Sequence, residues 1–307
     1  MPEPVGVIIP CVTVFDDGGE LDLAATTSNI DWLIDAGVNA LLVSGSCGEF
    51  SALEEHERCG LVEAAIEATD GRVPVFVGVM HTATAVAQRL ARHAQQAGAA
   101  AVMSVPPYYS SGPEREVMQY FRDIAGAIEI PLIVYNNPGA SGVALTVQTL
   151  GELATEGTTS MIKESHGDPT RIHDLRLVCP QSTRLIYGED YGALEALLVG
   201  ADGWVAGIGN IVPELAVGLY RAVSELDVAA ARKLWFELLP LINMTSFKPM
   251  FGRVDERPDY IQIFKAGLTL RGRPGGLPRR PLLALPDADL NYLSGLLETL
   301  SVLPQGV

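Results

Sequence analysis

Short apolar runs alternate with amphipathic segments along the first three quarters of the chain. Runs that are almost wholly apolar are typical of strands in a parallel sheet covered on both faces. The segments between them carry apolar residues at helical spacing, and two of them, 22–37 and 83–98, end on glycine, which favours a helix end. The predicted strands are 6–15, 40–46, 73–79, 100–107, 131–138, 159–165, 184–190 and 203–209.

Eight strands, each followed by a helical segment, predict an α/β fold in which helices ring a closed parallel sheet, a (β/α)8 or TIM barrel. A doubly wound open sheet is the competing prediction. It is less favoured because no glycine-rich phosphate loop follows the first strand, and the GSCGE stretch at 45–49 lacks the required spacing.

The last quarter of the chain differs in its sequence pattern, which predicts helices and a turn-rich stretch but no further strand. A turn-rich basic stretch at 271–281 is interpreted as a solvated loop. We therefore expect a barrel over 1–226 and a C-terminal helical region over 227–307. The helices predicted in this second region are 228–245, 259–270 and 287–300.

Composition narrows the range of partners. The formal net charge is −16, with 21 basic residues against 37 acidic ones, which argues against a nucleic-acid partner. No signal peptide and no apolar stretch of about 18 residues is evident, so no membrane partner is expected. The cysteines show no CxxC spacing, and we interpret them as free thiols in a reducing cytoplasm: Cys11, Cys47, Cys59 and Cys179.

Lys163 ends the sixth predicted strand and is one of only four lysines. In such barrels the active site lies at the carboxyl ends of the strands. An amine that loses hydration there becomes nucleophilic and can form a Schiff base with a ketone. The iminium withdraws electrons, which makes C–C cleavage, C–C formation or β-elimination feasible beside it. The alternative is a structural rim lysine paired with Glu189.

Schiff-base chemistry also needs a proton shuttle. Tyr135, which ends the neighbouring strand, and Ser46, which follows the second strand, are the candidates. The Ser46-Cys47-Gly48 turn exposes backbone N–H groups that suit a carboxylate. The structural alternatives are a core tyrosine with a satisfied hydroxyl and a plain tight turn.

No metal or other cofactor is expected. His81 and His166 stand on different predicted strands and lack an HxH or HExxH partner, so His81 alone is more typical of a structural role. A metal-dependent barrel lyase is the alternative. Its further ligands would come from the carboxylates at the strand ends: Glu49, Glu164, Glu189 and Asp190.

These strand-end motifs together resemble the dihydrodipicolinate synthase / N-acetylneuraminate lyase family of class I aldolases. The resemblance runs over nearly the whole chain, including the C-terminal helices. GSCGE stands where the family has G-[ST]-x-G-E, and PPYY where it has P-Y-Y. YNNPGASG stands for Y-N-x-P-x-x-[TS]-G, IKES for the Schiff-base K-[ED], and GADGWVAG for G-A-x-G-x-[IV]-S. Several ordered motifs are far more specific than any one alone.

The resemblance implies roles for the matched residues. The catalytic set it implies is one amine and three hydroxyls: Lys163, Tyr135, Ser46 and Tyr109. The family is usually a homotetramer, a dimer of tight dimers, and the same assembly is implied here. In the family's synthases, the tyrosine that matches Tyr109 reaches into the proton relay of the neighbouring subunit. The substrate-binding positions that match are Ser46, Cys47, Gly188 and Val205. His81 is similar to a histidine of some keto-deoxy sugar-acid dehydratases.

Three departures separate this chain from the family's synthases. Ala140 stands where those enzymes carry an arginine that grips the aldehyde's carboxylate, and no neighbour obviously replaces it. Cys47 replaces a threonine, and Ala206 replaces a serine. The overall pattern resembles a divergent branch that includes sugar-acid dehydratases and hydroxypyrroline-carboxylate deaminases.

The predicted function is a Schiff-base lyase or aldolase that acts on pyruvate or another 2-keto acid through an imine on Lys163. A keto-deoxy sugar-acid dehydratase or a hydroxypyrroline-carboxylate deaminase would use the same imine. A keto-acid-binding pseudoenzyme is the alternative from another class. The groups that discriminate among these are expected on the loops after strands 3, 5 and 7 and in segment 244–258.

Overall fold

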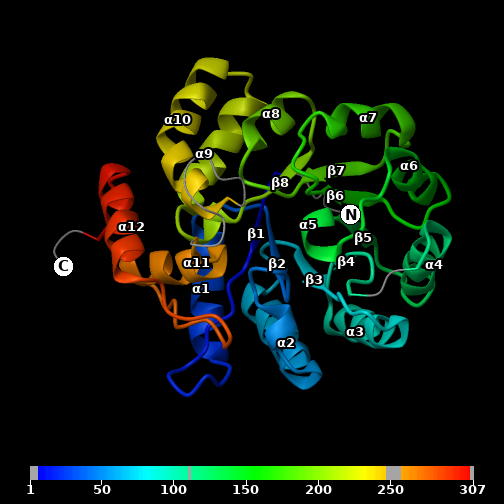
Figure 1. Cartoon of the computed structure of the whole chain (residues 1–307), viewed down its shortest axis with the longest axis horizontal. Coiled ribbons are helices and arrows are strands. Elements are labelled where there is room, and N and C mark those ends of the chain that lie inside the picture. Colours follow the sequence, from blue (N-terminus) through cyan, green and yellow to red (C-terminus); the bar gives the residue numbers. More distant parts are fainter. Residues whose placement is uncertain (1–5, 110–111, 247–256, 305–307) are drawn as a thin grey trace.

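The computed structural model describes residues 6–109, 112–246 and 257–304. Eight parallel strands close into a barrel in their order along the chain, and helices surround it (Figure 1), so the predicted fold class is confirmed. The strands are β1 (Gly6–Pro10), β2 (Ala40–Val43), β3 (Val75–Gly78), β4 (Ala101–Ser104), β5 (Leu132–Asn136), β6 (Met161–Glu164), β7 (Arg184–Tyr187) and β8 (Gly203–Val205).

The strands are shorter than the predicted runs. The run 6–15, for example, contains a strand that ends at Pro10, yet Val12 and Val14 beyond it are buried. The segment after β1 packs against the C-terminal part of the chain, where Val14 and Phe15 lie close to Gly276, so it remains apolar after the sheet hydrogen bonds stop. An apolar run therefore predicts that a strand is present, but it does not predict the residue at which the strand ends.

Successive side chains on each strand point to opposite faces of the sheet. On β6, Met161 belongs to the hydrophobic cluster inside the barrel, while Ile162 belongs to the layer between sheet and helices. Lys163 is two residues beyond Met161, so it shares the inner face. It lies opposite Tyr135 in the register of β5 and β6, and Tyr135 also belongs to the inner cluster.

The surrounding helices follow the predicted alternation with the strands. The glycines that close two of the predicted segments, Gly37 and Gly98, have φ of 88° and 103°, a left-handed conformation that ends a helix without steric cost. The helices of this part are α1 (Leu23–Asp35), α2 (Glu55–Thr69), α3 (Thr84–Ala97), α4 (Glu114–Ala125), α5 (Pro138–Ser141), α6 (Val147–Thr155), α7 (Arg171–Val178), α8 (Ala193–Leu198) and α9 (Pro213–Ser224), with 3-10 turns η1 (Phe50–Ala52) and η2 (Ile208–Asn210).

Three further helices pack beside the barrel at the C-terminal end (Figure 1): α10 (Val228–Thr245), α11 (Tyr260–Leu270) and α12 (Asp287–Thr299). They agree with the three predicted helices. One hydrophobic cluster includes Leu219 of α9 and Leu238 of α10, so the core runs across residue 226. The division of the chain at that residue stays a prediction.

The basic stretch 271–281 is only in part the solvated loop that we expected. Arg279 pairs with Glu57 at 2.5 Å and donates to two backbone carbonyls. Its guanidinium carbon lies 4.3 Å from the centroid of the Phe15 ring. The partners come from distant parts of the chain, which is why the local run of charge and glycine gave no sign of them.

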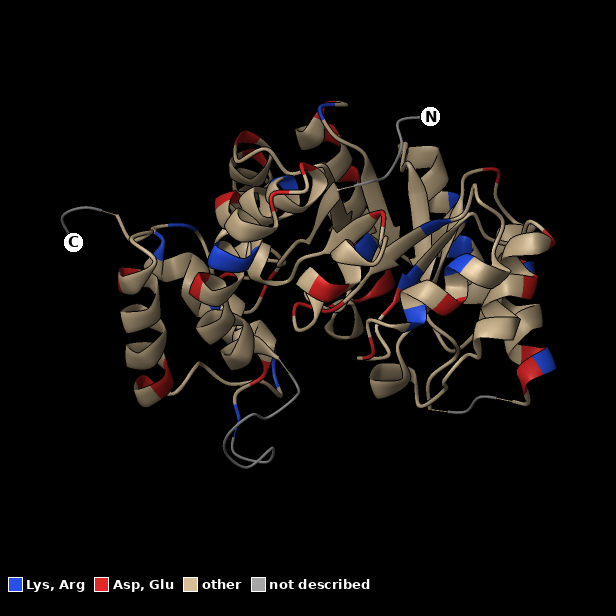
Figure 2. Cartoon of the chain, turned by 90° about the horizontal axis from the view of Figure 1, so that it is seen from above, with Lys and Arg blue, Asp and Glu red and all other residues tan. Residues whose placement is uncertain are grey.

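No helix in the described part of the chain is long and apolar enough to cross a membrane. Basic and acidic residues are interspersed along the ribbon in Figure 2. This agrees with the acidic composition of the chain.

Candidate active site

Lys163 lies at the end of β6 with its amine against the ring of Tyr135. Nζ is 3.8 Å from the ring centroid, and the residue is 5% exposed. The ion pairs formed by the described residues do not include Lys163. A ring face stabilises a buried cation less than a carboxylate does, so the Lys163 amine has weaker electrostatic support than a lysine paired with a carboxylate.

Gly188, at the end of β7, makes room for the lysine side chain. A methyl group at Gly188 would lie 2.5 Å from Lys163 Cε and 2.1 Å from Ser165 Oγ. The side-chain hydroxyl of Ser165 is buried without a hydrogen-bond partner among the described residues. The sequence analysis missed Ser165; its place two residues after Lys163, on the same face of the chain, was the available signal.

Gly188→Ala is expected to slow the trapping of a pyruvate adduct by about 100-fold or more, because the added methyl must displace Lys163 Cε. Intact-mass measurement after borohydride reduction checks it. Gly295→Ala is the matched control, because Gly295 is exposed in α12 and has nothing within 4 Å of an added methyl. Trapping at the wild-type rate in Gly188→Ala would show that the lysine does not need this space.

The hydroxyl of Tyr135 accepts a hydrogen bond from Asn137 Nδ2 at 2.7 Å. The orientation of that amide is set independently, because Asn137 Oδ1 accepts from the Ala140 N–H at 3.0 Å. Tyr135 Oη thus has an acceptor position filled and keeps its own proton to donate. The turn after β5, with Asn137 at the start of α5, therefore prepares Tyr135 to act as an acid near Lys163.

Glu164 follows Lys163 but points away from the barrel interior. It is fully buried, and its carboxylate accepts two hydrogen bonds from Asn136 and pairs with Arg171 at 3.1 Å. Burial raises the pKa of Glu164, and Arg171 and Asn136 oppose the shift. These contacts join the ends of β5 and β6, so Glu164 helps to hold Lys163 and Tyr135 side by side.

The loop after β2 carries Ser46 and Cys47. Ser44 and Glu49 bracket it with φ of 53° and 54°, so the chain turns sharply twice within six residues. Among the described residues, the N–H groups of Ser46 and Cys47 donate to no other backbone or side-chain group. Successive free N–H groups of this kind suit a carboxylate. Burial raises the pKa of Cys47 to about 12, so its thiol stays protonated at neutral pH.

Arg58, on α2, forms hydrogen bonds both with the loop after β2 and with the end of β3. It donates to Ser44 Oγ at 3.1 Å and to the carbonyls of Gly78 and Met80 at 2.8 and 3.1 Å. Burial lowers the pKa of Arg58 to about 10, so it remains a cation at neutral pH. The sequence analysis missed it, because an arginine in a helical segment gives no sign that it turns inward. Phe50 covers it, with the guanidinium carbon 5.4 Å from the ring centroid.

Asp190 follows β7 and binds the turn after β8. Its carboxylate accepts from the N–H groups of Gly207 and Ile208, both at 2.9 Å. Burial raises the pKa of Asp190 to about 7, and these two hydrogen bonds oppose the shift. Val205 ends β8 just before this turn and belongs to the inner cluster with Tyr135. Asp190 therefore joins the ends of β7 and β8 on the far side of the mouth.

The raised pKa of Asp190 predicts a pH dependence of stability. The folded state holds this proton more tightly than the unfolded chain, so the stabilisation is complete below about pH 4 and is lost as the pH rises through about 7. Relative to wild type, Asp190→Asn should thus gain free energy of unfolding between pH 4 and pH 7 and change little outside that window. Urea unfolding of both proteins across this range checks it; a difference independent of pH would contradict it.

Three predicted residues lie elsewhere. His81 is half-buried, and its Nδ1 accepts from the Ala83 N–H at 2.9 Å at the start of α3, so it serves that turn. Tyr109 is fully exposed in the single chain, with φ of 74°. His166 is also exposed. The roles of His81 and Tyr109 stay predictions, whereas Lys163 and Tyr135 are brought together at the barrel mouth.

The metal alternative finds no support in the described part of the chain. There, no three or more histidine, cysteine, aspartate or glutamate side chains gather in a group that could hold a metal ion. Asp190 and Glu164, which the sequence placed among candidate ligands, are engaged with backbone N–H groups and with Arg171.

Comparison with known proteins places this chain in a family. The model of the dihydrodipicolinate synthetase family matches residues 3–299. A 4-hydroxy-tetrahydrodipicolinate synthase of Methanopyrus kandleri is 33% identical over 303 residues, which cover 98% of each chain. A protein of Escherichia coli K12 named a probable 2-dehydro-3-deoxy-D-pentonate aldolase is 37% identical over 241 residues, 77% of this chain and 80% of the relative.

Solved structures agree over the whole fold. YagE of E. coli K12, determined in complex with pyruvate, has a TM-score of 0.90 and 30% identity, covering 98% of this chain and 99% of its own. Dihydrodipicolinate synthase of Aquifex aeolicus has a TM-score of 0.89 and 28% identity, covering 98% and 100%. The predicted resemblance is confirmed, and the chain is an enzyme of the lyase class. It belongs to the dihydrodipicolinate synthetase family of aldolases and lyases.

Proposed function

We propose that the chain is a class I aldolase in which Lys163 forms an imine with pyruvate or another 2-keto acid. The observation that carries the proposal is the buried Lys163 amine, 3.8 Å from the Tyr135 ring centroid and outside every ion pair of the described residues. The neutral nitrogen would attack the keto carbon. The carbonyl oxygen would receive one proton from that nitrogen and one from Tyr135 and leave as water, which leaves a protonated imine and the Tyr135 phenolate.

The loop after β2 supports the binding of a 2-keto acid. The N–H groups of Ser46 and Cys47 are free to receive the carboxylate beside the reacting carbon. Once the imine forms, the Tyr135 phenolate would take a proton from the adjacent C3 atom, and the enamine that results would attack an aldehyde. Tyr135 would then return the proton to the alkoxide that forms. The reverse sequence cleaves the C–C bond. No cofactor is needed, because the iminium itself accepts the electron pair.

From the turn after β5 we infer that the aldehyde acceptor of the second half-reaction is not the one that the family's synthases use. Ala140 presents only a methyl group where the synthases are expected to carry an arginine, and its N–H is held by Asn137. The relatives include proteins named as aldolases of 2-dehydro-3-deoxy sugar acids. We therefore propose a 2-keto-3-deoxy sugar acid as the substrate class. Segment 244–258, which was expected to help decide this, lies mostly outside the described residues.

The proposed assembly is a cytoplasmic homotetramer, a dimer of dimers. The full exposure of Tyr109, whose ring extends from the loop after β4, fits a residue that contacts a second copy. Sedimentation or light scattering tests the oligomeric state.

Borohydride reduction in the presence of pyruvate tests the imine. An adduct mapped to Lys163 supports the proposal, and no adduct at saturating pyruvate would reject it. A panel of 2-keto-3-deoxy sugar acids, pyruvate with aldehydes, and hydroxypyrroline carboxylates, analysed by product mass, then separates aldol cleavage, condensation, dehydration and deamination. An adduct without turnover on the whole panel would identify a pseudoenzyme, and loss of turnover with EDTA would indicate a metal-dependent lyase.

A further inference from the structure

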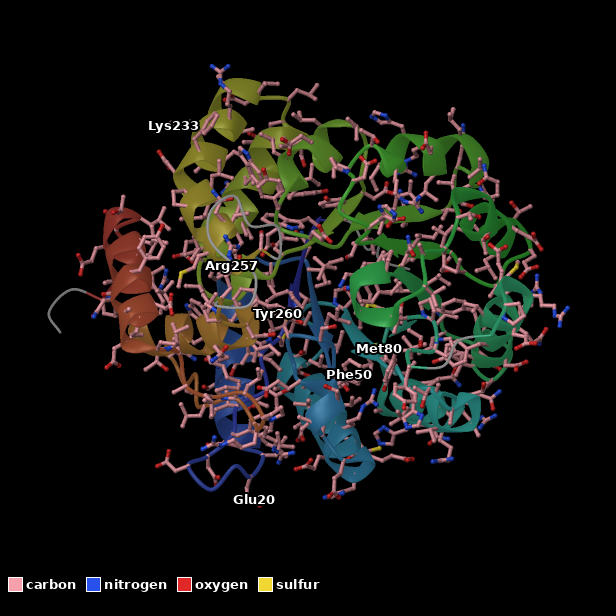
Figure 3. All side chains as sticks on the ribbon, viewed as in Figure 1. Glu20, Phe50, Met80, Lys233, Arg257 and Tyr260 are labelled. Carbon is pink, nitrogen blue, oxygen red and sulfur yellow. The ribbon has the colours of Figure 1, made fainter. Side chains whose placement is uncertain are left out.

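Helix α11 begins at the barrel mouth, and its first residue is Tyr260. A capping box fixes this start: Asp259 accepts from the Ile261 N–H at 2.8 Å, and the Asp259 N–H donates to Gln262 at 2.7 Å. Figure 3 shows Tyr260 at the edge of the C-terminal helices that faces the barrel. Its phenol forms a hydrogen bond with the Ser46 hydroxyl and has Cys47 and Tyr135 among its electrostatic neighbours.

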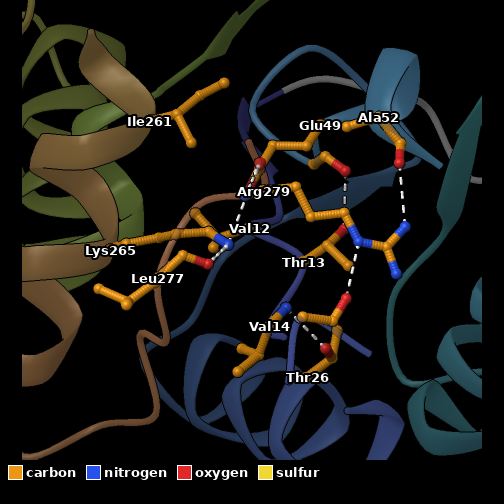
Figure 4. Close-up of polar contacts among 12 residues, drawn as sticks. Val12, Thr13, Val14, Thr26, Glu49, Ala52, Ile261, Lys265, Leu277 and Arg279 are labelled. Atoms are coloured by element: carbon orange, nitrogen blue, oxygen red, sulfur yellow. Dashed lines mark hydrogen bonds and ion pairs between the residues drawn. The ribbon is translucent and has the colours of Figure 1, made fainter. Parts of the chain in front are cut away.

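The same helix is anchored to the same loop a second time. Lys265 Nζ pairs with Glu49 at 2.6 Å, and both side chains are almost completely buried (Figure 4). Lys265 Nζ also donates to the Leu277 carbonyl at 2.9 Å. Ser46 and Glu49 belong to one turn after β2, so α11 holds that turn at both ends.

Packing keeps the Tyr260 ring in place. The rings of Tyr260 and Phe264 are 5.7 Å apart at an angle of 55°. Phe264 in turn packs over Gly207, where an added methyl would lie 2.7 Å from its ring. Gly207 is held by Asp190, so the position of α11 is tied to the ends of β7 and β8 as well as to the loop after β2.

Either hydroxyl can donate in the hydrogen bond between Tyr260 and Ser46, and the arrangement in which Tyr260 donates leaves the Ser46 proton available. Burial raises the pKa of Tyr260 well above its usual range, so the phenol keeps its proton at neutral pH. It can therefore donate to Ser46 Oγ, which leaves Ser46 to give its own proton to another acceptor. The Tyr135 oxygen accepts a hydrogen bond from Asn137 Nδ2 at 2.7 Å.

We propose that Tyr260 is a positioning residue that completes the proton relay from within the same chain, by fixing the Ser46 hydroxyl as a donor towards Tyr135 and the Lys163 imine. The inference rests on the proposed imine and extends it. It gives the C-terminal helix a part in the chemistry through the loop after β2.

The test uses pyruvate alone. An imine loses a C3 proton to form the enamine, and in deuterium oxide the return step places deuterium on the methyl group, which proton NMR follows. Tyr260→Phe is expected to slow this exchange about 10- to 100-fold, while the fraction of protein trapped by borohydride at saturating pyruvate stays at the wild-type level. Tyr220→Phe is the matched control, because Tyr220 lies on α9 and its phenol donates to the carbonyl of Asp202, which precedes β8, away from the mouth.

A second variant separates positioning from a general structural effect. If Tyr260 acts through Ser46, then Tyr260→Phe added to Ser46→Ala should slow the exchange no further. Additive effects would overturn the inference, as would exchange at the wild-type rate in Tyr260→Phe or a slowing seen only in Tyr109→Phe. Absence of any trapped adduct in the wild-type protein would instead reject the imine itself, so the two failures are distinguishable.

Discussion

Lys163→Met is expected to abolish the pyruvate adduct and to lower turnover by about 10,000-fold or more, because no other group can form the imine. The same change should leave the free energy of unfolding unchanged or raise it. The Lys163 amine is buried without an ion pair among the described residues, and methionine replaces it with an apolar side chain of similar length. Borohydride trapping with mass spectrometry and urea unfolding measure the two effects.

Lys233→Met is the control for this experiment, since Lys233 is exposed on α10 and its contact with Glu237 is 3.9 Å long. It should affect neither trapping nor stability by a measurable amount. An adduct that persists in Lys163→Met, mapped to another lysine, would show that the reactive amine had been misassigned. A large loss of stability would show that Lys163 is structural.

Lys265→Met is expected to have the opposite signature, a loss of about 3–5 kcal/mol of unfolding free energy. Lys265 is as buried as Lys163, but it pairs with the buried carboxylate of Glu49 and lies 4.3 Å from the centroid of the Phe15 ring. Burial lowers the pKa of Lys265, and Glu49 opposes the shift. Removing the cation leaves a carboxylate without its partner in an apolar site. Urea unfolding measures the loss.

A double variant tests whether that cost comes from the stranded carboxylate. Lys265→Met combined with Glu49→Gln removes both charges, so it should recover a large part of the stability lost in the single variant. Glu49 also accepts from the Arg279 N–H at 2.9 Å, a contact that glutamine preserves. If the double variant is less stable than Lys265→Met alone, the pair does not act as a unit.

Lys163 and Lys265 are both buried, but only the burial of Lys163 could be predicted from the sequence. Lys163 stood at the end of an apolar run, where period-two alternation puts it on the inner face two residues after Met161. Local pattern was therefore enough to predict its burial, and register put Tyr135 beside it. Lys265 stood in a helical segment, where one face is normally solvated, so nothing local indicated its burial.

The amino-acid sequence by itself predicted the eight strands, their closure into a barrel and the place of Lys163 beside Tyr135, because apolar runs and helical spacing are local properties of the chain. Only the tertiary structure decided how α11 meets the loop after β2. Glu49 and Arg279 touch across 230 positions of sequence, and Tyr260 reaches Ser46 over a similar span. Contacts of that kind depend on how whole elements pack, since each partner taken alone looks like an ordinary polar residue.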